Sequence, residues 1–241
     1  MSSIAIQLHG DLRNWDRGRT VWLAIKAYIE KRLGLDVDIY GFFWLNDYSR
    51  SCNFDLMTVK LSEIPKVGIV DKEERGIKPR GMYPWAYALF QANKIRKLSF
   101  KKHDIVFSCR PDYLLSNDQV ESSIRVLQGN TKHDRFSMIY DSHNGVNKWH
   151  FHKTGNDNGF CGFSEAIDLF STAFHLCYLD KDPSFYPTNH NVQGLVIDRY
   201  NINSLYGNIT GRILREFPDF SFKDIDEFIY DNWKAYLDIY K

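Results

Sequence analysis

The sequence predicts an α/β fold, a three-layer α/β/α sandwich with a mostly parallel central sheet, and two observations carry this prediction. The first is a β-α-β opening, in which residues 4–8 alternate as a strand up to Gly10 and Asp36–Phe43 form a second strand after a helix. The second is the apolar run Ile105–Phe107, which suits a strand that helices cover on both faces. Strands that alternate with helices in this way favour a parallel sheet.

Helical spacing of apolar residues predicts the helices that separate these strands. Gly34 is placed to end the first helix, and Asn117 and Ser164 are placed to cap two later ones. The expected helices are Thr20–Leu33, Pro84–Lys97, one starting at Asn117, Ser164–Leu179 and an amphipathic one over 222–240, with a further strand at Arg135–Asp141. Because no repeat, low-complexity segment or linker interrupts the chain, residues 1–241 are expected to form a single domain on which the last helix packs.

Composition narrows the expected partners and compartment. The 31 basic and 30 acidic residues give no global electrostatic reason to bind nucleic acid or an anionic membrane, although residues 94–103 are locally basic. The four cysteines show no CxxC spacing, which is typical of free thiols in a reducing compartment. No apolar run has the length of a membrane span and the first residues show no signal-sequence pattern, so a cytoplasmic protein is expected.

Charged residues that follow the predicted strands are candidates for a ligand site, because ligands in open α/β sheets bind beyond the carboxyl ends of strands. Arg110 suits phosphate oxygens, which a guanidinium meets bidentately, and Asp112 suits a hard cation. Arg13 follows the first strand, at the place expected for a nucleotide. Two simpler interpretations stay open: an Arg110–Asp112 ion pair that ends the strand, and a surface pairing of Arg13 with Asp11 or Asp16.

Two later segments add candidate residues. Asp157 lies among glycines that permit tight turns and close approach of a ligand. A carboxylate there is suited to deprotonate or to position an acceptor hydroxyl, and the alternative is an Asx-turn residue without chemistry. Arg80, with Lys78, precedes a predicted helix N-terminus, which favours anions.

Four stretches near these strand ends carry a resemblance to a known family. They are Gly10–Arg13 after the first strand, an aromatic-rich helix from Tyr83, the strand and turn His103–Asp112, and a turn at Asp157–Gly162. In their order and spacing, over Ile4–Tyr178, the chain resembles the WavE-like lipopolysaccharide glycosyltransferases and related viral and bacterial sugar transferases. The resemblance implies a GT-A-like nucleotide-sugar fold and, for a protein of viral type, the host cytoplasm.

The resemblance also implies a donor, a nucleotide-diphosphate sugar, and a divalent cation. The implied donor contacts are Gly10, Arg13, Arg80, Arg110 and Asp112, and the implied catalytic residues are Arg110 and Asp157. Mn²⁺ or Mg²⁺ would be bound by Asp112 and by His190, since GT-A folds often take a late histidine as an additional ligand. The family's Asp-x-Asp triplet is Arg-Pro-Asp here, so only its second carboxylate is present.

The sequence therefore predicts a hexosyl- or pentosyltransferase, inverting or retaining, whose default acceptor is a surface glycan or a lipopolysaccharide precursor. Three alternatives stay open. The first is a sugar transferase acting on a hydroxylated base in DNA, for which residues 94–103 would be the basic footprint. The second is a metal-dependent phosphoesterase, which would need clustered ligands. Its ligands would come from Asp112, Asp141, His143, His150 and His152. The third is a non-catalytic carbohydrate-binding protein that uses the aromatic residues.

Overall fold

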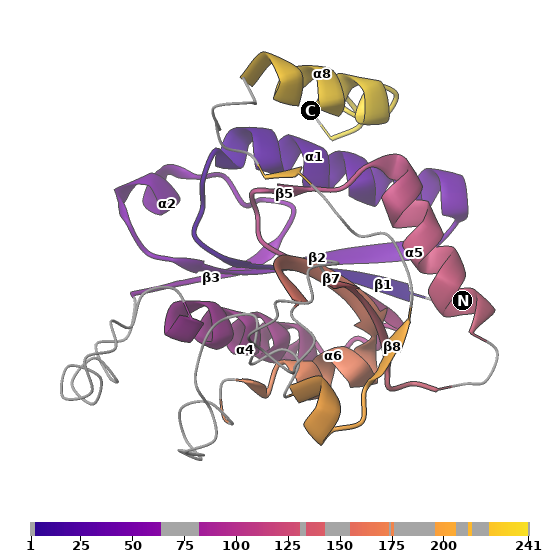
Figure 1. Ribbon diagram of the computed structural model, residues 1–241. Helices are drawn as coiled ribbons and strands as arrows, with labels where there is room; N and C mark the ends of the chain where they lie inside the picture. The colour runs from indigo at the N-terminus through magenta and orange to yellow at the C-terminus, as the bar shows by residue number, and fades with distance from the viewer. Residues whose placement is uncertain are drawn as a thin grey trace, which may run out of the picture.

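A seven-stranded mixed sheet forms the centre of the computed structural model (Figure 1). Its strands lie in the order β3-β2-β1-β4-β7-β6-β8. Their bounds, in that order, are Thr58–Ser62, Asp36–Trp44, Ser3–Gly10, Ile105–Cys109, Gly155–Phe163, Ser137–Ser142 and Asn203–Leu205. A separate two-stranded sheet pairs β5 (Tyr113–Leu114) with β9 (Arg212–Ile213). The structure describes residues 3–63, 82–130, 134–142, 155–173, 175, 196–205, 212–213 and 222–240.

The sheet is mostly parallel. Strands β3, β2, β1 and β4 run in one direction, and β6 and β8 run parallel to each other. Strand β7 is antiparallel to both of its neighbours, β4 and β6, so it is the one reversed strand of the seven described. The side of the sheet at which β1 and β4 end, at Gly10 and Cys109, is called here the carboxyl edge, and the opposite side the amino edge.

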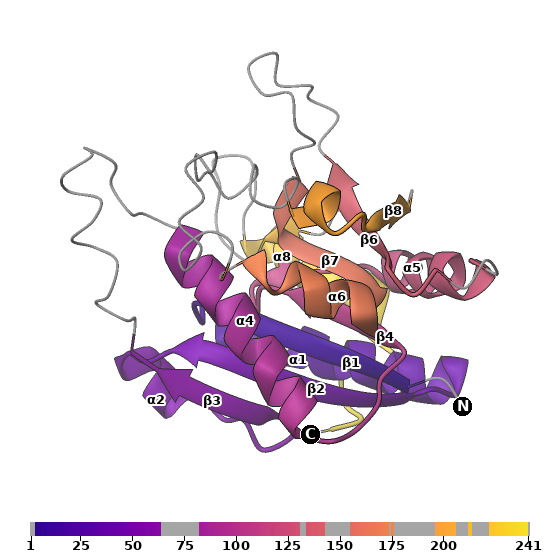
Figure 2. The same cartoon turned by 90° about the horizontal axis from the view of Figure 1, so that it is seen from below.

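Helices cover both faces of the sheet (Figures 1 and 2). One face carries α1 (Trp15–Tyr28), α5 (Asn117–Gly129) and α8 (Phe222–Trp233), and the other carries α4 (Met82–Leu98) and α6 (Ser164–Phe170). The π-helical turn η1 (Ile29–Leu33) continues α1, and α2 (Asp47–Ser51) is a short helix after β2. The predicted fold class, an α/β/α sandwich around a mostly parallel sheet, is confirmed.

Strand alternation creates two separate hydrophobic cores, one on each face of the sheet. In β1, Ile4, Ile6 and Leu8 pack with α1, α5 and α8, whereas Ala5 packs with α4 and α6. Strand β4 is buried at every position and contributes to both cores. The prediction of a strand covered on both faces is therefore confirmed for β4.

Several helix boundaries differ from the sequence-based expectation. Helix α1 begins at Trp15 rather than Thr20, after Asn14 in a left-handed conformation with φ 50°. Helix α5 is capped by Ser116 rather than Asn117. The Ser116 side chain accepts from the Gln119 amide while the Gln119 side chain accepts from the Ser116 amide.

Helix α6 starts at Ser164 but ends at Phe170, well short of the predicted end. Its last turn explains the early stop. The hydroxyls of Ser171 and Thr172 donate to the carbonyl oxygens of Asp168 and Leu169, and such local bonds compete with helix continuation. Gly34 ends η1 in a left-handed conformation with φ 68°, as predicted.

The glycine-rich segment predicted to form a turn is instead the long strand β7, which lies between β4 and β6. Its glycines are explained by close packing rather than by turn geometry. A Cβ on Gly159 would lie 2.7 Å from ring atoms of Tyr113, and one on Gly162 would lie 2.6 Å from the Cβ of Met138. The interpretation of Asp157–Gly162 as a turn is therefore wrong.

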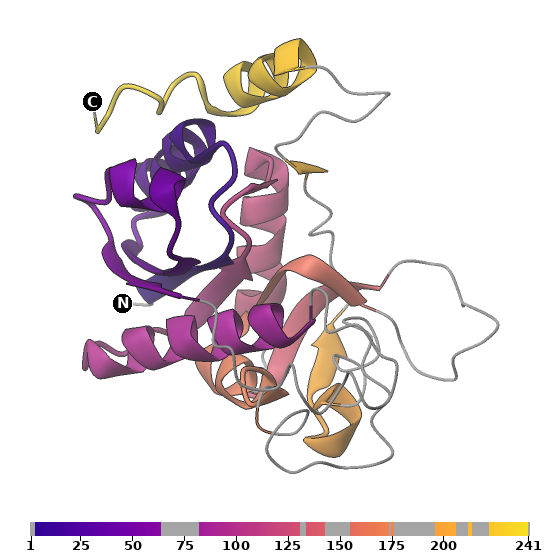
Figure 3. The same ribbon diagram turned by 90° about the vertical axis from the view of Figure 1, so that its left-hand side faces the viewer.

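The C-terminal helix α8 is the outermost layer and packs against α1 (Figure 3). Trp233 is fully buried, and its indole N–H donates to the carbonyl oxygen of Leu115 over 3.1 Å. The regular helix ends at Trp233, and the predicted continuation to residue 240 forms turns whose side chains still pack on the core of this face. Within the described ranges, no helix has both the length and the apolar character needed to cross a bilayer.

Candidate functional site

The turn that follows β4 holds a tight ion pair between Arg110 and Asp112. The guanidinium donates from Nε to Oδ1 over 2.9 Å and from Nη2 to Oδ2 over 2.7 Å. Asp112 is completely buried, whereas the Arg110 side chain is 20% exposed. The Pro111 carbonyl accepts from the Trp22 indole over 3.1 Å, which anchors the turn to α1. The ion pair foreseen as the simpler interpretation is present, and it presents a rigidly held cation at the carboxyl edge.

In this arrangement Asp112 is not suited to bind a metal ion. Both of its oxygens accept from the Arg110 guanidinium, whose positive charge would repel a bound cation. Among the residues whose side chains the structure describes, no group of three or more His, Cys, Asp or Glu is arranged to hold an ion. His190 lies outside the described residues, so its role as a ligand of Mn²⁺ or Mg²⁺ stays a prediction.

Gly10 and Arg110 meet at the carboxyl edge because β1 and β4 are neighbours. The register pairs Leu8 with Cys109, which puts the residues that follow each strand side by side. Gly10 has φ +108°, which side chains rarely adopt, and no side-chain or distant backbone atom of the described residues lies within 4 Å of where its Cβ would be. A ligand can therefore approach the backbone closely at this position.

Arg13 lies three residues beyond Gly10 and is half exposed. Its Nη2 contacts Asp11 Oδ2 at 3.3 Å, with side-chain exposures of 47% for Arg13 and 45% for Asp11. The surface ion pair with Asp11 is thus present. A contact between Arg13 and a phosphate group stays a prediction, since an exposed pair of this kind is weak enough to exchange partners.

Strand pairing places the backbone of Asp157 at the same edge. Gly159 of β7 pairs with Cys109 of β4, so the residues just before Gly159 lie next to the Arg110 turn. Between β6 and β7 the register shifts: Tyr140 pairs with Phe160, but Ser142 pairs with Gly155. Asp157 lies inside this irregularity, and irregular strand segments of this kind are over-represented next to active sites. The structure does not describe its side chain.

Several predicted site residues lie outside the described residues. They are Lys78, Arg80, His143, His150, His152 and His190. For Asp141 only the backbone is described, as part of β6. The grouping of Gly10, Arg13, Arg110, Asp112 and Asp157 around one edge is accordingly the part of the predicted site that the structure brings together.

His9 belongs to this edge and was missed by the sequence analysis. It is completely buried, between the rings of Trp85 (centroid distance 6.4 Å) and Phe160 (6.3 Å). Among the residues that the structure describes, neither of its ring nitrogens has a hydrogen-bond partner. A buried polar atom without a partner costs roughly 1–3 kcal/mol, so this arrangement needs a reason. A polar residue that directly precedes the glycine at a strand end was the available signal.

Burial, and to a smaller extent the nearby Arg110 charge, together lower the pKa of His9 to about 3. The imidazole is therefore neutral over the physiological pH range. Burial has the opposite effect on the pKa of two cysteines near the same edge. It raises the pKa of Cys109 and Cys161, so their thiols stay protonated. Both are free thiols, as predicted, and neither is suited to act as a thiolate nucleophile.

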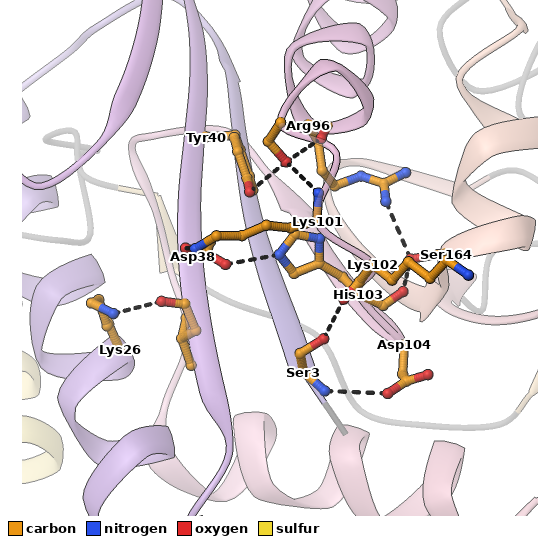
Figure 4. A network of polar contacts seen from close by, with 12 residues as sticks. Ser3, Lys26, Asp38, Tyr40, Arg96, Lys101, Lys102, His103, Asp104 and Ser164 are labelled. Carbon is orange, nitrogen blue, oxygen red and sulfur yellow. Dashed lines mark hydrogen bonds and ion pairs between the residues drawn. The ribbon is translucent and has the colours of Figure 1, made fainter. Parts of the chain in front are cut away.

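The amino edge holds a contrasting network in which basic side chains face carboxylates (Figure 4). Asp38 accepts from Lys101 over 2.6 Å and contacts His103 Nε2 at 3.0 Å. Asp168 contacts the buried Arg96 and, at 3.3 Å, Lys97. Three of the five lysines and arginines of the basic stretch 94–103 thus face carboxylates, which weakens that stretch as a footprint for nucleic acid.

Comparison with known proteins finds structural similarity to solved structures. No protein-family model matches the sequence, and no curated protein matches it. Among solved structures, the chain is similar to the crystal structure of a glycosyltransferase involved in the glycosylation of the major capsid of PBCV-1. The identity is 10%, the TM-score is 0.46, and the match covers 84% of this chain and 80% of the other. At these values the likeness leaves the activity of this chain to be argued from its own residues.

Proposed function

We propose that the protein is a glycosyltransferase that moves a sugar from a nucleotide-diphosphate sugar to an acceptor hydroxyl at the carboxyl edge of its sheet. The observation that carries this proposal is the Arg110 guanidinium, held bidentately by a fully buried Asp112 beside the open backbone of Gly10. A fixed cation beside an accessible backbone turn is what a departing diphosphate requires. The resemblance to sugar transferases, over Ile4–Tyr178, supports the same reaction.

Arg110 would stabilise the negative charge that develops on the departing diphosphate. Its preorganisation matters, because a cation already fixed in place costs no reorganisation when the glycosidic bond to phosphate breaks. Asp112 acts through Arg110 as a positioning residue, since both carboxylate oxygens are occupied by the guanidinium. Arg13 and Arg80 are proposed as further contacts of the phosphate groups.

Asp157 is proposed as the group that deprotonates the acceptor hydroxyl, or that positions it if the reaction retains configuration. Its support is the register that places this residue beside the Arg110 turn, inside the irregular part of β7. A carboxylate on a different strand from the proposed diphosphate contacts separates donor binding from acceptor activation. A divalent cation enters the proposal through residues beyond the described ranges, His190 among them.

A surface glycan or its precursor is the proposed acceptor. The alternative of a hydroxylated base in DNA is less favoured, because Arg96, Lys97 and Lys101 already face carboxylates. A filter-binding measurement with duplex DNA across a salt series tests this point. Affinity that falls steeply with salt would restore the DNA alternative, since that slope counts neutralised phosphates.

The decisive experiment is incubation with a panel of nucleotide-diphosphate sugars, followed by measurement of released nucleoside diphosphate. Slow release without acceptor is expected from the wild-type protein and should fall strongly in Arg110→Ala. Arg125→Ala is the matched control, because Arg125 is an exposed arginine on α5, away from the carboxyl edge. Release of inorganic phosphate instead would indicate a phosphoesterase, and an untouched donor that still binds would indicate a carbohydrate-binding protein.

A further inference from the structure

A row of buried polar side chains runs toward the carboxyl edge on the face covered by α4 and α6. It consists of Gln7 and His9 of β1 and Ser108 of β4, and all three are completely buried. Gln7 Nε2 donates to Ser108 Oγ over 3.2 Å, but Gln7 Oε1 has no partner within the described ranges. Apolar side chains fill the same face elsewhere, so three polar residues along two adjacent strands are an exception that calls for a cause.

His9 is the member of this row that stands nearest the ligand site. It directly precedes Gly10, and its environment includes the Arg110 charge, which helps to keep the imidazole neutral. The two ring nitrogens are the most poorly satisfied polar atoms of the row, because both lack a partner in the part of the chain that the structure describes. A fixed guanidinium and an unsatisfied imidazole therefore lie close together at the end of two neighbouring strands.

Because the His9 imidazole is neutral, it can bind only certain groups of a ligand. A neutral imidazole offers one N–H donor and one nitrogen acceptor and carries no charge for a phosphate. A hydroxyl group also donates and accepts, so hydroxyls are the natural complement of this side chain. Arg110 supplies the charge for phosphate, and His9 supplies the uncharged contact beside it. Together they match a phosphate with a sugar hydroxyl next to it.

We propose that His9 is a specificity residue of the donor site and hydrogen-bonds a hydroxyl of the nucleotide-diphosphate sugar, either on the ribose or on the transferred sugar. This inference rests on the proposed function, since it assigns a residue to the same site. Because His9 is fully covered, contact requires a rotamer change of its imidazole or of Trp85. Rotamer changes of this kind are common when ligands bind.

The competing interpretation is a core histidine satisfied by water, and the variant His9→Leu separates the two. Under the proposal, removing two unsatisfied nitrogens should leave the thermal stability of the protein unchanged or raised, whereas under the competing interpretation the lost hydrogen bonds to water should lower it. Only the proposal expects a loss of affinity, of roughly tenfold, which is the scale of one hydrogen bond in a desolvated site. Ser123→Ala is the matched control, because Ser123 Oγ is also buried without a partner but lies on α5, on the opposite face.

Calorimetry would measure the binding of three groups of ligands. They are pyrophosphate, the four common ribonucleoside diphosphates with their 2′-deoxy forms, and UDP- and GDP-sugars. We expect His9→Leu to bind pyrophosphate like the wild type and to bind the sugar-containing probes more weakly. A loss already seen with ribonucleoside diphosphates but not with 2′-deoxy forms assigns the ribose 2′-hydroxyl. A loss confined to nucleotide sugars assigns the transferred sugar. His9→Gln, which keeps a donor and an acceptor, should restore most of the affinity.

Two results would overturn the proposal while the proposed function stands. One is equal affinity of the wild type and His9→Leu for every probe, and the other is an equal loss for pyrophosphate, which would indicate damage to Arg110. If the wild-type protein binds none of the nucleoside diphosphates or nucleotide sugars, the proposed function fails and this inference fails with it. If His9→Leu does not fold, His9→Gln with unchanged stability and a tenfold weaker affinity for all probes would also contradict the proposal.

Discussion

The two edges of the sheet use charge in opposite ways. At the amino edge, Asp38 accepts from the well-exposed Lys101 side chain and contacts His103 Nε2. At the carboxyl edge, the Arg110–Asp112 pair is largely buried, and neither ring nitrogen of His9 has a partner among the described residues. An exposed ion pair such as that of Lys101 with Asp38 contributes about 0–1 kcal/mol.

The difference indicates where a ligand is needed. Buried polar atoms without a partner among the described residues occur at both edges, since Arg96 Nε and His103 Nδ1 are also unsatisfied. At the carboxyl edge, however, both ring nitrogens of His9 are unsatisfied, and they lie near a buried ion pair, the open backbone of Gly10 and an irregular strand. Features of this kind concentrate at binding and catalytic sites. Substitutions at the two edges are therefore expected to have different effects on turnover, stability and ligand affinity.

The largest expected effect is on catalysis, at Asp157. Asp157→Asn should lower turnover at saturating donor by about 10²–10⁴-fold, the contribution of one general base. The affinity for nucleoside diphosphate should change little, because the phosphate contacts lie on other strands. Asn156→Ala is the neighbouring control within the same irregular segment of β7. Normal turnover of Asp157→Asn, whatever its stability, would remove Asp157 from the mechanism.

The next effect is on stability and contrasts two Arg–Asp pairs with the same spacing. Asp112→Asn should destabilise the protein by about 3 kcal/mol, because it leaves the Arg110 charge uncompensated beside a buried site. For a chain of this length that corresponds to a fall in Tm of roughly 6–12 °C. Asp11→Asn, which breaks the exposed pair with Arg13, should cost at most about 1 kcal/mol. Similar small shifts for both variants in thermal unfolding would show that the burial of Asp112 has no energetic weight.

A smaller effect is expected for ligand binding at Arg13. Arg13→Ala should weaken the binding of nucleoside diphosphate by roughly tenfold, the scale of one hydrogen bond to a charged group. Its thermal stability should stay close to that of the wild type, because the pair with Asp11 is half exposed. Calorimetry with the nucleoside diphosphate measures the first quantity and thermal unfolding the second. Unchanged affinity would place Arg13 outside the donor site.

The smallest effect is expected at the amino edge. Burial alone would raise the pKa of Asp38, but hydrogen bonds from Lys101 and His103 outweigh it and lower the pKa below its usual 3.8. A lowered carboxyl pKa contributes stability that is present above pH 3.8 and is lost as the pH falls through the pKa of the folded state.

Asp38→Asn should therefore reduce stability by no more than about 1 kcal/mol at neutral pH and leave donor release unchanged. The difference from the wild type should shrink as the pH falls below 3.8, and unfolding curves recorded between pH 6 and pH 2.5 measure it. A loss of donor release in Asp38→Asn would contradict the division of roles between the two edges.

Patterns among neighbouring residues in the sequence correctly predicted several strands and helix ends. The alternation in β1, the apolar run in β4 and the stop at Gly34 all appear as expected, because side-chain period and glycine conformation act within a few residues. The same applies to the Arg110–Asp112 pair, whose partners stand two residues apart. The residues gathered at the carboxyl edge were also foreseen, since ligand sites follow the ends of parallel strands.

Tertiary structure decided the rest, because it depends on partners far apart in the sequence. Nothing near Gly159 and Gly162 signals a strand; they form one because β4 and β6 supply hydrogen bonds on both sides, with Tyr113 and Met138 too close to admit a side chain. Likewise, Trp22 of α1 holds the turn that contains Asp112, and the rings of Trp85 and Phe160 surround His9. These aromatic residues come from other elements of the fold. The sequence by itself determined which residues reach the carboxyl edge. Packing between distant segments determined which of them are buried and paired, and which lack a hydrogen-bond partner.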